Sequence, residues 1–478
     1  MTHSATPTPV HTPRGATRAS RPRLILGVLA LGCGAFALLQ TLVAPALPVL
    51  QRDLHTSTSG AGWVFTSFLL AASVAAPIAG RLGDMFGKKR VLVISLAFLV
   101  AGSLLAAVAT SLIVLIAART IQGLGGAIYP LAFGIIRDEF PPERVASAIA
   151  LVSSLLGIGG GLGIVLAGPI LQHLSYHWLF WILLMLTSVA TVAAIVFIPE
   201  SSVRAPGKVH WLGGVLLSAW LVALLVAVSE GATWHWGSAK TLGLFTLSAL
   251  LAGAWVKAES GARQPLVDMK TMRLRGVWTT NTAALLLGFG QYSALILIPQ
   301  LVQAPTSTGY GYGASVSQAG LFLVPTTIAS MITSPISGRL SNLVGSKVPL
   351  VLGAILTTIA FVVLTIATSR WEIYLATTLV GAGVGLSFAS MANLIVEAVP
   401  PAQTGVATGM NTIVRTIGGA IGAGIAASVL GAHLLASGEP AKHGYTITFV
   451  LCTAVLIAGV LASLAVPGHT RRQPRSKR

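Results

Sequence analysis

The chain has 478 residues, of which 54% are hydrophobic and 9% are charged, whereas soluble domains carry about 25% charged residues. This composition excludes an ordinary soluble enzyme and predicts one membrane protein that crosses the bilayer many times. The formal net charge of +18 does not indicate a nucleic-acid partner, because the basic residues are sorted by membrane side and do not gather into one patch.

A helix that spans a bilayer needs roughly 20 apolar residues. The sequence contains fourteen candidate runs, the shortest of which is 241–257. In chain order, the runs cover residues 24–50, 61–79, 91–110, 112–135, 145–171, 178–198, 211–229, 241–257, 277–301, 316–337, 348–368, 372–396, 404–432 and 446–466. We therefore predict an all-α integral membrane protein with fourteen transmembrane helices.

The basic residues predict the orientation of the chain. With the N-terminus in the cytoplasm, 24 of the 30 Lys and Arg residues fall in cytoplasmic segments, four fall in outer loops, and Arg119 and Arg415 lie within apolar runs. Because Lys and Arg favour the cytoplasmic side, both termini are expected there, which requires an even number of helices. The tails 1–23 and 467–478 are basic and are expected to rest against anionic lipid, and the first is expected to be disordered.

The sequence shows no chemistry typical of an enzyme. Cys33 and Cys452 lie far apart in apolar runs and predict neither a disulfide nor a metal site. There is no phosphate-binding P-loop, so ATP is not expected to act directly. No nucleophile–base set is visible, and we expect no cofactor.

Residues 80–90, with the sequence GRLGDMFGKKR, join the second and third runs. We expect a short polar loop in which Gly80, Gly83 and Gly87 allow a tight reversal. Asp84 is the only acid of the stretch and needs a specific partner.

This pattern resembles the loop between helices 2 and 3 of the major facilitator superfamily, of form G-x-L-x-D-r-x-G-r-k. The resemblance implies that Asp84 binds the end of a helix of the second half and a nearby arginine, for which Arg137 is the candidate. For the last three residues, a role as a topology signal alone remains open. The gate loop then comprises Gly80, Arg81, Asp84, Gly87, Lys88, Lys89 and Arg90.

An internal repeat indicates the architecture. Residues 77–93 recur at 335–351, where Asn342 replaces Asp84, and a second match relates 141–163 to 400–422 at nearly the same offset. The offset spans eight helices, so runs 1–6 and 9–14 form equivalent bundles. Parallel repeats place a substrate cavity at their interface near the middle of the bilayer.

The repeat divides the chain into three parts. We expect an N-terminal six-helix bundle at 24–199, a linker with two inserted helices at 200–276, and a C-terminal six-helix bundle at 277–466. This arrangement is similar to the fourteen-helix drug:proton antiporter branch of the superfamily.

Two arginines lie inside apolar runs. Arg119, Gln122 and Gly123 resemble the R-x-x-Q-G motif, which the family implicates in proton coupling; structural hydrogen bonding of Arg119 to carbonyls is the alternative. Arg415 is the deepest charge in the chain, and pairing with carbonyls or lipid is its alternative role. An arginine at such depth is costly and is expected to face the protein interior.

The fifth run is rich in glycine, including Gly159, Gly163 and Gly168. It resembles the antiporter motif G-x-x-x-G-P-x-x-G-G, but Ile164 replaces the proline and Ala167 replaces a glycine. A hinge and ordinary close packing of helices both remain open.

The first run departs most from the antiporter branch, because Leu39 stands where relatives carry an acid. None of the 12 acidic residues lies in mid-span. Two deep arginines without a deep carboxylate disfavour a lone organic cation, so we expect a neutral, zwitterionic or anionic cargo. Proton coupling would then use Glu230, Glu397, a histidine or ionisation of the cargo.

Polar and aromatic residues within the apolar runs are candidates for the cavity lining, although each can also be a helix-packing residue. These candidates are Gln40, Tyr129, Gln291, Tyr292, Asn393 and Asn411. The resemblance implies a monomeric, proton-driven exporter of small amphipathic molecules in the cytoplasmic membrane. The alternatives are an importer of a specific metabolite and a membrane sensor or scaffold without transport activity.

Overall fold

The computed structural model describes residues 22–56, 58–201, 210–435 and 439–468. The basic tails expected at 1–23 and 467–478 lie almost entirely outside these residues. Within them, fourteen helical spans are long and apolar enough to cross a membrane, which confirms the expected all-α architecture.

The spans follow the predicted runs closely, and the short run at 241–257 is a full helix. The first six spans are α1 (Pro22–Thr41), α3 (Thr58–Phe86), α4 (Lys88–Ala107), α5 (Leu112–Gly123) with α6 (Ile128–Glu139), α7 (Pro142–His173) and α8 (His177–Phe197). The two inserted spans are α9 (Trp211–Trp234) and α10 (Ala239–Gly261). The last six spans are α12 (Arg275–Gln303), α13 (Val316–Val344), α14 (Lys347–Ile366), α15 (Arg370–Ala398), α16 (Thr404–Ala432) and α17 (Lys442–Ala465).

Short helices occupy the junctions between the spans. They are η1 (Ala44–Ala46), α2 (Leu47–Asp53), α11 (Met269–Met272), η2 (Thr306–Thr308) and η3 (Pro401–Gln403). The predicted single helix at 24–50 is therefore wrong, since α1 ends at Thr41. Pro45 follows this end, and proline lacks the N–H that would continue the hydrogen-bond ladder of the helix.

The prediction of a polar loop at 80–90 is also wrong. α3 continues to Phe86 and α4 begins at Lys88, so only Gly87 lies outside both helices. Gly87 makes the reversal with a φ of 111°, which residues with a Cβ rarely adopt. Gly80 and Gly83 are helix-packing residues instead, because a Cβ at either position would meet Gly405 or Leu131, respectively.

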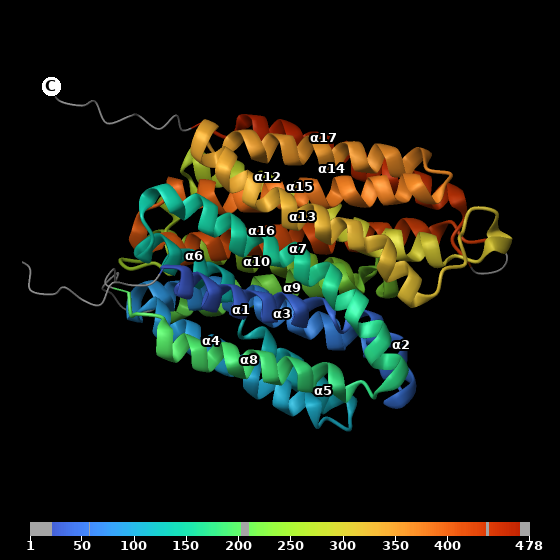
Figure 1. Cartoon of the computed structure of the whole chain (residues 1–478), viewed down its shortest axis with the longest axis horizontal. Coiled ribbons are helices and arrows are strands. Elements are labelled where there is room, and N and C mark those ends of the chain that lie inside the picture. Colours follow the sequence, from blue (N-terminus) through green and yellow to red (C-terminus); the bar gives the residue numbers. More distant parts are fainter. Residues whose placement is uncertain (1–21, 57, 202–209, 436–438, 469–478) are drawn as a thin grey trace, which may run out of the picture.

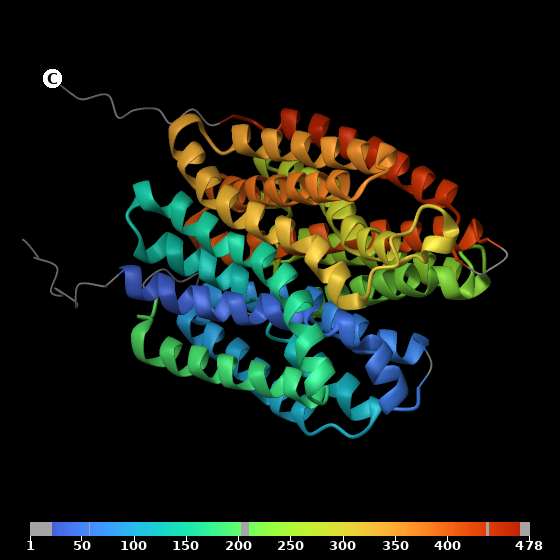
Figure 2. The same ribbon diagram turned by 45° about the vertical axis from the view of Figure 1, so that its right-hand side comes forward.

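The helices form two groups that lie side by side (Figures 1 and 2). The first six spans share one apolar core, which includes Phe68 and Phe180, and the last six share another, which includes Phe361 and Phe449. The groups meet mainly where α13 packs on α7 and α16 packs on α3, and α15 also contacts α7 while α16 contacts α6. α9 contacts both α3 and α16, and α10 packs on α9.

Because the number of spans is even, Pro22 and Gly468 lie at the same end of the bundle as the α3–α4 junction. We refer to this as the terminal end, and to the side that carries α2 as the opposite end (Figure 1).

Cysteine labelling tests this arrangement. Exposed basic residues supply two sites at the terminal end, Arg90 and Arg273, and two at the opposite end, Arg52 and Lys442. With the terminal end in the cytoplasm, an impermeant maleimide should label Arg52→Cys and Lys442→Cys in intact cells. Arg90→Cys and Arg273→Cys should react only after permeabilisation.

The background of this experiment is low, because Cys33 and Cys452 are buried. Labelling of Arg52→Cys together with Arg90→Cys in intact cells would contradict the arrangement of spans.

Candidate functional site

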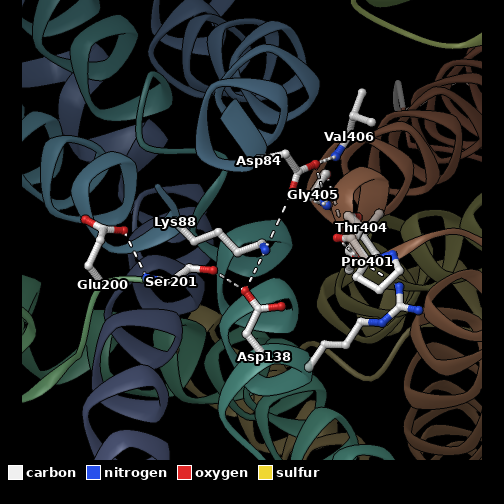
Figure 3. A network of polar contacts seen from close by, with 11 residues as sticks. Asp84, Lys88, Asp138, Glu200, Ser201, Pro401, Thr404, Gly405 and Val406 are labelled. Atoms are coloured by element: carbon white, nitrogen blue, oxygen red, sulfur yellow. Dashed lines mark hydrogen bonds and ion pairs between the residues drawn. The ribbon is translucent and has the colours of Figure 1, made fainter. Parts of the chain in front are cut away.

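Asp84 joins the two halves at the terminal end. Its Oδ2 accepts hydrogen bonds from the backbone N–H groups of Gly405, at 3.1 Å, and Val406, at 3.3 Å. These groups belong to the first turn of α16, where N–H groups lack partners within the helix and carry partial positive charge. Asp84 is fully buried, so the helix end takes the place of water around the carboxylate (Figure 3).

Two glycines allow this contact. A Cβ at Gly80 would lie 2.5 Å from the carbonyl oxygen of Gly405, and a Cβ at Gly405 would lie 2.6 Å from that of Gly80. Any larger residue at either position would push α3 away from α16, and Asp84 would no longer reach the N–H groups.

The ion-pair partner of Asp84 is Lys88, which corrects the expected pairing with Arg137. Lys88 Nζ lies 3.9 Å from Asp84 Oδ1 and 2.6 Å from Asp138 Oδ2. Its side chain is fully buried and passes Gly134, where a Cβ would lie 2.7 Å from Lys88 Cε. Lys88 is thus part of the buried network and does not act as a topology signal alone.

The other basic residues of the stretch differ from Lys88 in their exposure. Arg81 is half-buried and attracts Asp84 electrostatically. Lys89 is half-exposed and Arg90 is exposed, as a topology signal requires.

Arg137 forms a second bridge between the halves. Its Nη1 donates to Thr404 Oγ1 at 2.6 Å, and its Nη2 donates to the carbonyl oxygen of Val399 at 3.0 Å. Asp84 and Arg137 therefore hold the same helix end from two sides: Asp84 accepts from α16, and Arg137 donates to the segment that leads into it.

Sequence reasoning missed three members of this network. Asp138 also accepts from the hydroxyl of Ser201, whose backbone N–H donates to Glu200 at 3.2 Å (Figure 3). The Glu200 carboxylate covers Gly87, where a Cβ would collide with it. Glu200 is an acid directly after the sixth apolar run, and this position was the available signal.

In the repeat-related contact of the second pair of helices, a neutral residue replaces Asp84. Asn342, the counterpart of Asp84, donates from Nδ2 to the carbonyl oxygen of Glu143 at 3.1 Å and to Ser147 Oγ at 3.2 Å. Ser346 and Glu397 are the repeat counterparts of Lys88 and Asp138, and Ser346 donates a hydrogen bond to Glu397 at 2.9 Å. The coupling candidate Glu397 is thus an exposed residue of this terminal-end contact.

Arg119 is buried inside the first half. Its Nε donates to the carbonyl oxygen of Val64 at 3.0 Å, and its Nη1 donates to that of Leu39 at 3.3 Å and to Gln122 Oε1 at 2.8 Å. The guanidinium also lies 4.3 Å from the centre of the Phe68 ring. This geometry matches the structural alternative for Arg119, since Nε and Nη1 donate to two backbone carbonyls and one side-chain amide, while Nη2 has no partner among the described residues.

The other motif residues support this packing. Gln122 Nε2 donates to Ser103 Oγ at 3.0 Å. Gly123 ends α5 at a point where a Cβ would lie 2.6 Å from the carbonyl oxygen of Phe68.

A small pocket lies between the halves, with a cavity volume of about 10 Å³, room for roughly one water molecule. α6 and α7 contribute one side of it, and α15 and α16 contribute the other. Its lining residues are Tyr129, Phe133, Ser153, Leu156, Phe388, Ala392, Thr408, Asn411, Thr412 and Arg415.

Two of the six predicted cavity candidates, Tyr129 and Asn411, line this pocket. The threonines Thr408 and Thr412 were missed, although their spacing with Arg415 along α16 places all three on one helix face.

The other four candidates lie outside the pocket lining. Gln40 Nε2 donates to Tyr292 Oη at 3.1 Å, a contact between α1 and α12. Asn393 Nδ2 donates to the carbonyl oxygen of Ala146 at 3.4 Å, also between the halves. Gln291 Oε1 is buried without a hydrogen-bond partner among the described residues.

The glycines of α7 favour close packing. A Cβ at Gly159 or Gly163 would collide with α1, whose Thr41 hydroxyl donates to the Gly159 carbonyl at 2.7 Å. Gly168 is half-buried. α7 is continuous from Pro142 to His173, so no break marks a hinge.

The family model described as Major Facilitator Superfamily matches residues 29–423 and 280–478. The chain is 31% identical over 397 residues to multidrug resistance protein 3 of Bacillus subtilis, covering 82% of this chain and 76% of the relative. It is 28% identical over 416 residues to the tetracenomycin C resistance and export protein of Streptomyces glaucescens, covering 85% and 75%.

Among solved structures, the human organic anion transporter MFSD10 (TETRAN) is similar, with a TM-score of 0.68. The match covers 93% of this chain and 99% of the other at 17% identity, and shows a shared fold.

Replacing Asp84 by Asn should loosen the terminal end. The change removes the charge that α16 stabilises, and a hydrogen bond to a charged group contributes about 1.5–3 kcal/mol. A cysteine at Thr408, buried between the halves, should then react with maleimide about tenfold faster. Glu139→Gln, an acid near the same end, is the control and should leave the rate unchanged; equal rates in both variants would contradict the role of Asp84.

Replacing Lys88 by Met should destabilise the protein strongly. It leaves Asp138 buried without its cation, and breaking a buried pair costs about 3–5 kcal/mol. Thermal unfolding in detergent should show a large loss for Lys88→Met and almost none for the neighbouring Lys89→Met. The double variant Lys88→Met/Asp138→Asn should recover much of the loss, and equal unfolding temperatures for the two single variants would count against the buried pair.

Proposed function

Because the chain belongs to the Major Facilitator Superfamily, we propose that it exports small amphipathic molecules, such as drugs or antibiotics, from the cell. Two relatives that each match more than four-fifths of this chain are named for multidrug resistance and for tetracenomycin C resistance and export. The observation that carries the proposal is a pocket enclosed between two repeat-related bundles that polar contacts join at one end.

The bundles 24–199 and 277–466 move as units about this pocket in our proposal, and 200–276 links them. With both termini in the cytoplasm, the contacts of Asp84 and Arg137 close the cytoplasmic side. Loss of these contacts opens that side to cargo, and their formation seals it while the opposite end releases cargo.

The strength of the contacts sets the free energy that opening of the gate requires. Reversing a 1:99 population needs about 5.5 kcal/mol, and each hydrogen bond to a charged group contributes about 1.5–3 kcal/mol. Asp84 and Arg137 together make four such bonds across the halves. Their sum is therefore about 6–12 kcal/mol, so opening the gate requires that contacts made only in the open state, including those to cargo, offset most of it.

A proton gradient drives this export in our proposal, and each monomer works alone because one chain supplies both sides of the pocket. Of the two candidate acids, Glu230 is buried in α9 and Glu397 is exposed. Next to Glu230, Ser229 hydrogen-bonds to Thr66 of α3 at 3.5 Å. This position, beside a helix of the gate, favours Glu230 as the proton site.

An efflux assay tests the function. Expression in a bacterial host without its own pumps should lower the accumulation of at least one amphipathic antibiotic several-fold. An uncoupler should restore accumulation while ATP remains available. Uptake by right-side-out vesicles without uptake by inverted vesicles would indicate an importer, and absence of any flux would leave a sensor or scaffold.

Glu230→Gln should uncouple transport from protons, because the amide cannot bind and release a proton in the working pH range. Uphill export in inverted vesicles should fall at least tenfold, while downhill exchange of cargo should persist. Glu397→Gln serves as the matched control and should keep uphill export. If Glu230→Gln pumps as well as the wild type, another group carries the proton.

A further inference from the structure

Arg415 differs from the other deep arginine in what its donors meet. Both guanidinium groups lie 4.3 Å from the centre of a phenylalanine ring, Phe68 for Arg119 and Phe388 for Arg415. Arg119 donates three hydrogen bonds to neighbouring groups. The Arg415 guanidinium lines the pocket and makes no side-chain hydrogen bond within the described part of the chain.

The surroundings of Arg415 supply no counter-ion. The pocket lining contains Arg415 and no carboxylate. Asp84 of α3 contacts α16 at Gly405. Gly405 and Arg415 are ten residues apart on α16, so this acid lies about 15 Å from Arg415 along the helix axis. Arg415 is half-buried, and a partly desolvated cation without an acid or an acceptor is costly, so its five N–H donors call for an anionic partner.

A second buried donor faces the same pocket from the other half. Ser153 of α7 lines the pocket, is 4% exposed, and its hydroxyl has no hydrogen-bond partner among the described residues. The adjacent Ser154 is equally buried but donates to the carbonyl oxygen of Leu151 at 2.6 Å. Ser153 is therefore an unsatisfied donor on the first half, opposite an unsatisfied cation on the second.

The remaining walls are aromatic. Phe388 stacks on the guanidinium, and Phe133 and Tyr129 line the pocket from α6. The Tyr129 hydroxyl donates a hydrogen bond to the carbonyl oxygen of Cys33 at 3.1 Å. Such walls suit a planar apolar body attached to the charged group.

We propose that Arg415 and Ser153 form the subsite for the anionic group of the cargo, so that the transported molecules are aromatic organic anions such as sulfonates or carboxylates. This inference rests on the proposed transport function. The pocket holds about 10 Å³ in this conformation, so the aromatic body enters when the halves part. The anion then contacts both halves, and it binds the same helix whose first turn Asp84 holds.

The test uses two probes with the same ring and opposite permanent charge, naphthalene-1-sulfonate and 1-naphthyltrimethylammonium. Binding to the purified full-length protein is measured by calorimetry, and flux is measured in proteoliposomes under a pH gradient. The wild type should bind and transport the sulfonate in preference to the ammonium compound. Arg415→Gln should weaken sulfonate binding at least tenfold, and Arg415→Lys should retain most of it.

The two serines provide a matched pair of variants. Ser153→Ala should weaken sulfonate binding about tenfold, the effect expected for a lost hydrogen bond to a charged group, whereas Ser154→Ala should leave it unchanged. Arg415→Lys and Ser154→Ala also show that a change at these positions leaves the fold intact.

The outcomes separate this inference from the export function. Sulfonate binding that is absent, or that is equal in wild type and Arg415→Gln, overturns the subsite. Preference for the ammonium probe does the same, even when export is observed. Sulfonate binding that depends on Arg415, without flux of any probe, supports the subsite and contradicts the proposed transport function.

Discussion

The positive end of α16 is the point on which the arrangement of the two halves depends. Its first-turn N–H groups have no partners within their own helix, and Asp84 of the other half supplies them with a buried carboxylate. Neither group would be stable at this depth without the other, since an unpaired buried charge and unpaired N–H groups are both costly. The contact between halves therefore has two discrete states, made with both groups satisfied or broken with both exposed to water.

The internal repeat duplicates the geometry of this contact but not its charge. Gly80 packs on Gly405, and Gly338 packs in the same way on Ser147, where a Cβ at Gly338 would lie 2.8 Å from Ser147 Cα. At the first contact a carboxylate accepts from a helix end, whereas at the second Asn342 donates to neutral groups. The strong electrostatic contact thus lies on the side that α9 covers, and a weaker, neutral contact lies between α7 and α13.

The two deep arginines show how identical chemistry takes on different roles. Each stacks on a phenylalanine at 4.3 Å, which satisfies part of the cost of burying a cation. Arg119 donates from Nε and Nη1 to oxygens of the first half, although its Nη2 has no partner among the described residues. Arg415 faces the interface, where its guanidinium meets no hydrogen-bond acceptor among the described residues. The role of each arginine therefore depends on whether it lies inside one half or at the interface between the halves.

The sequence by itself determined the fourteen spans and the repeat, because both depend on local apolar length and on matching residue patterns along the chain. It also indicated that Asp84, Arg119 and Arg415 are unusual, since a charge surrounded by apolar residues is visible without a fold. Only the tertiary structure decided the partners. Lys88 and not Arg137 pairs with Asp84, because helix α3 continues through the expected loop and turns Lys88 inward. Asp84 and Gly405 are 321 residues apart, and Ser153 and Arg415 come from different halves; no local pattern encodes which of many polar residues will meet once the two bundles pack.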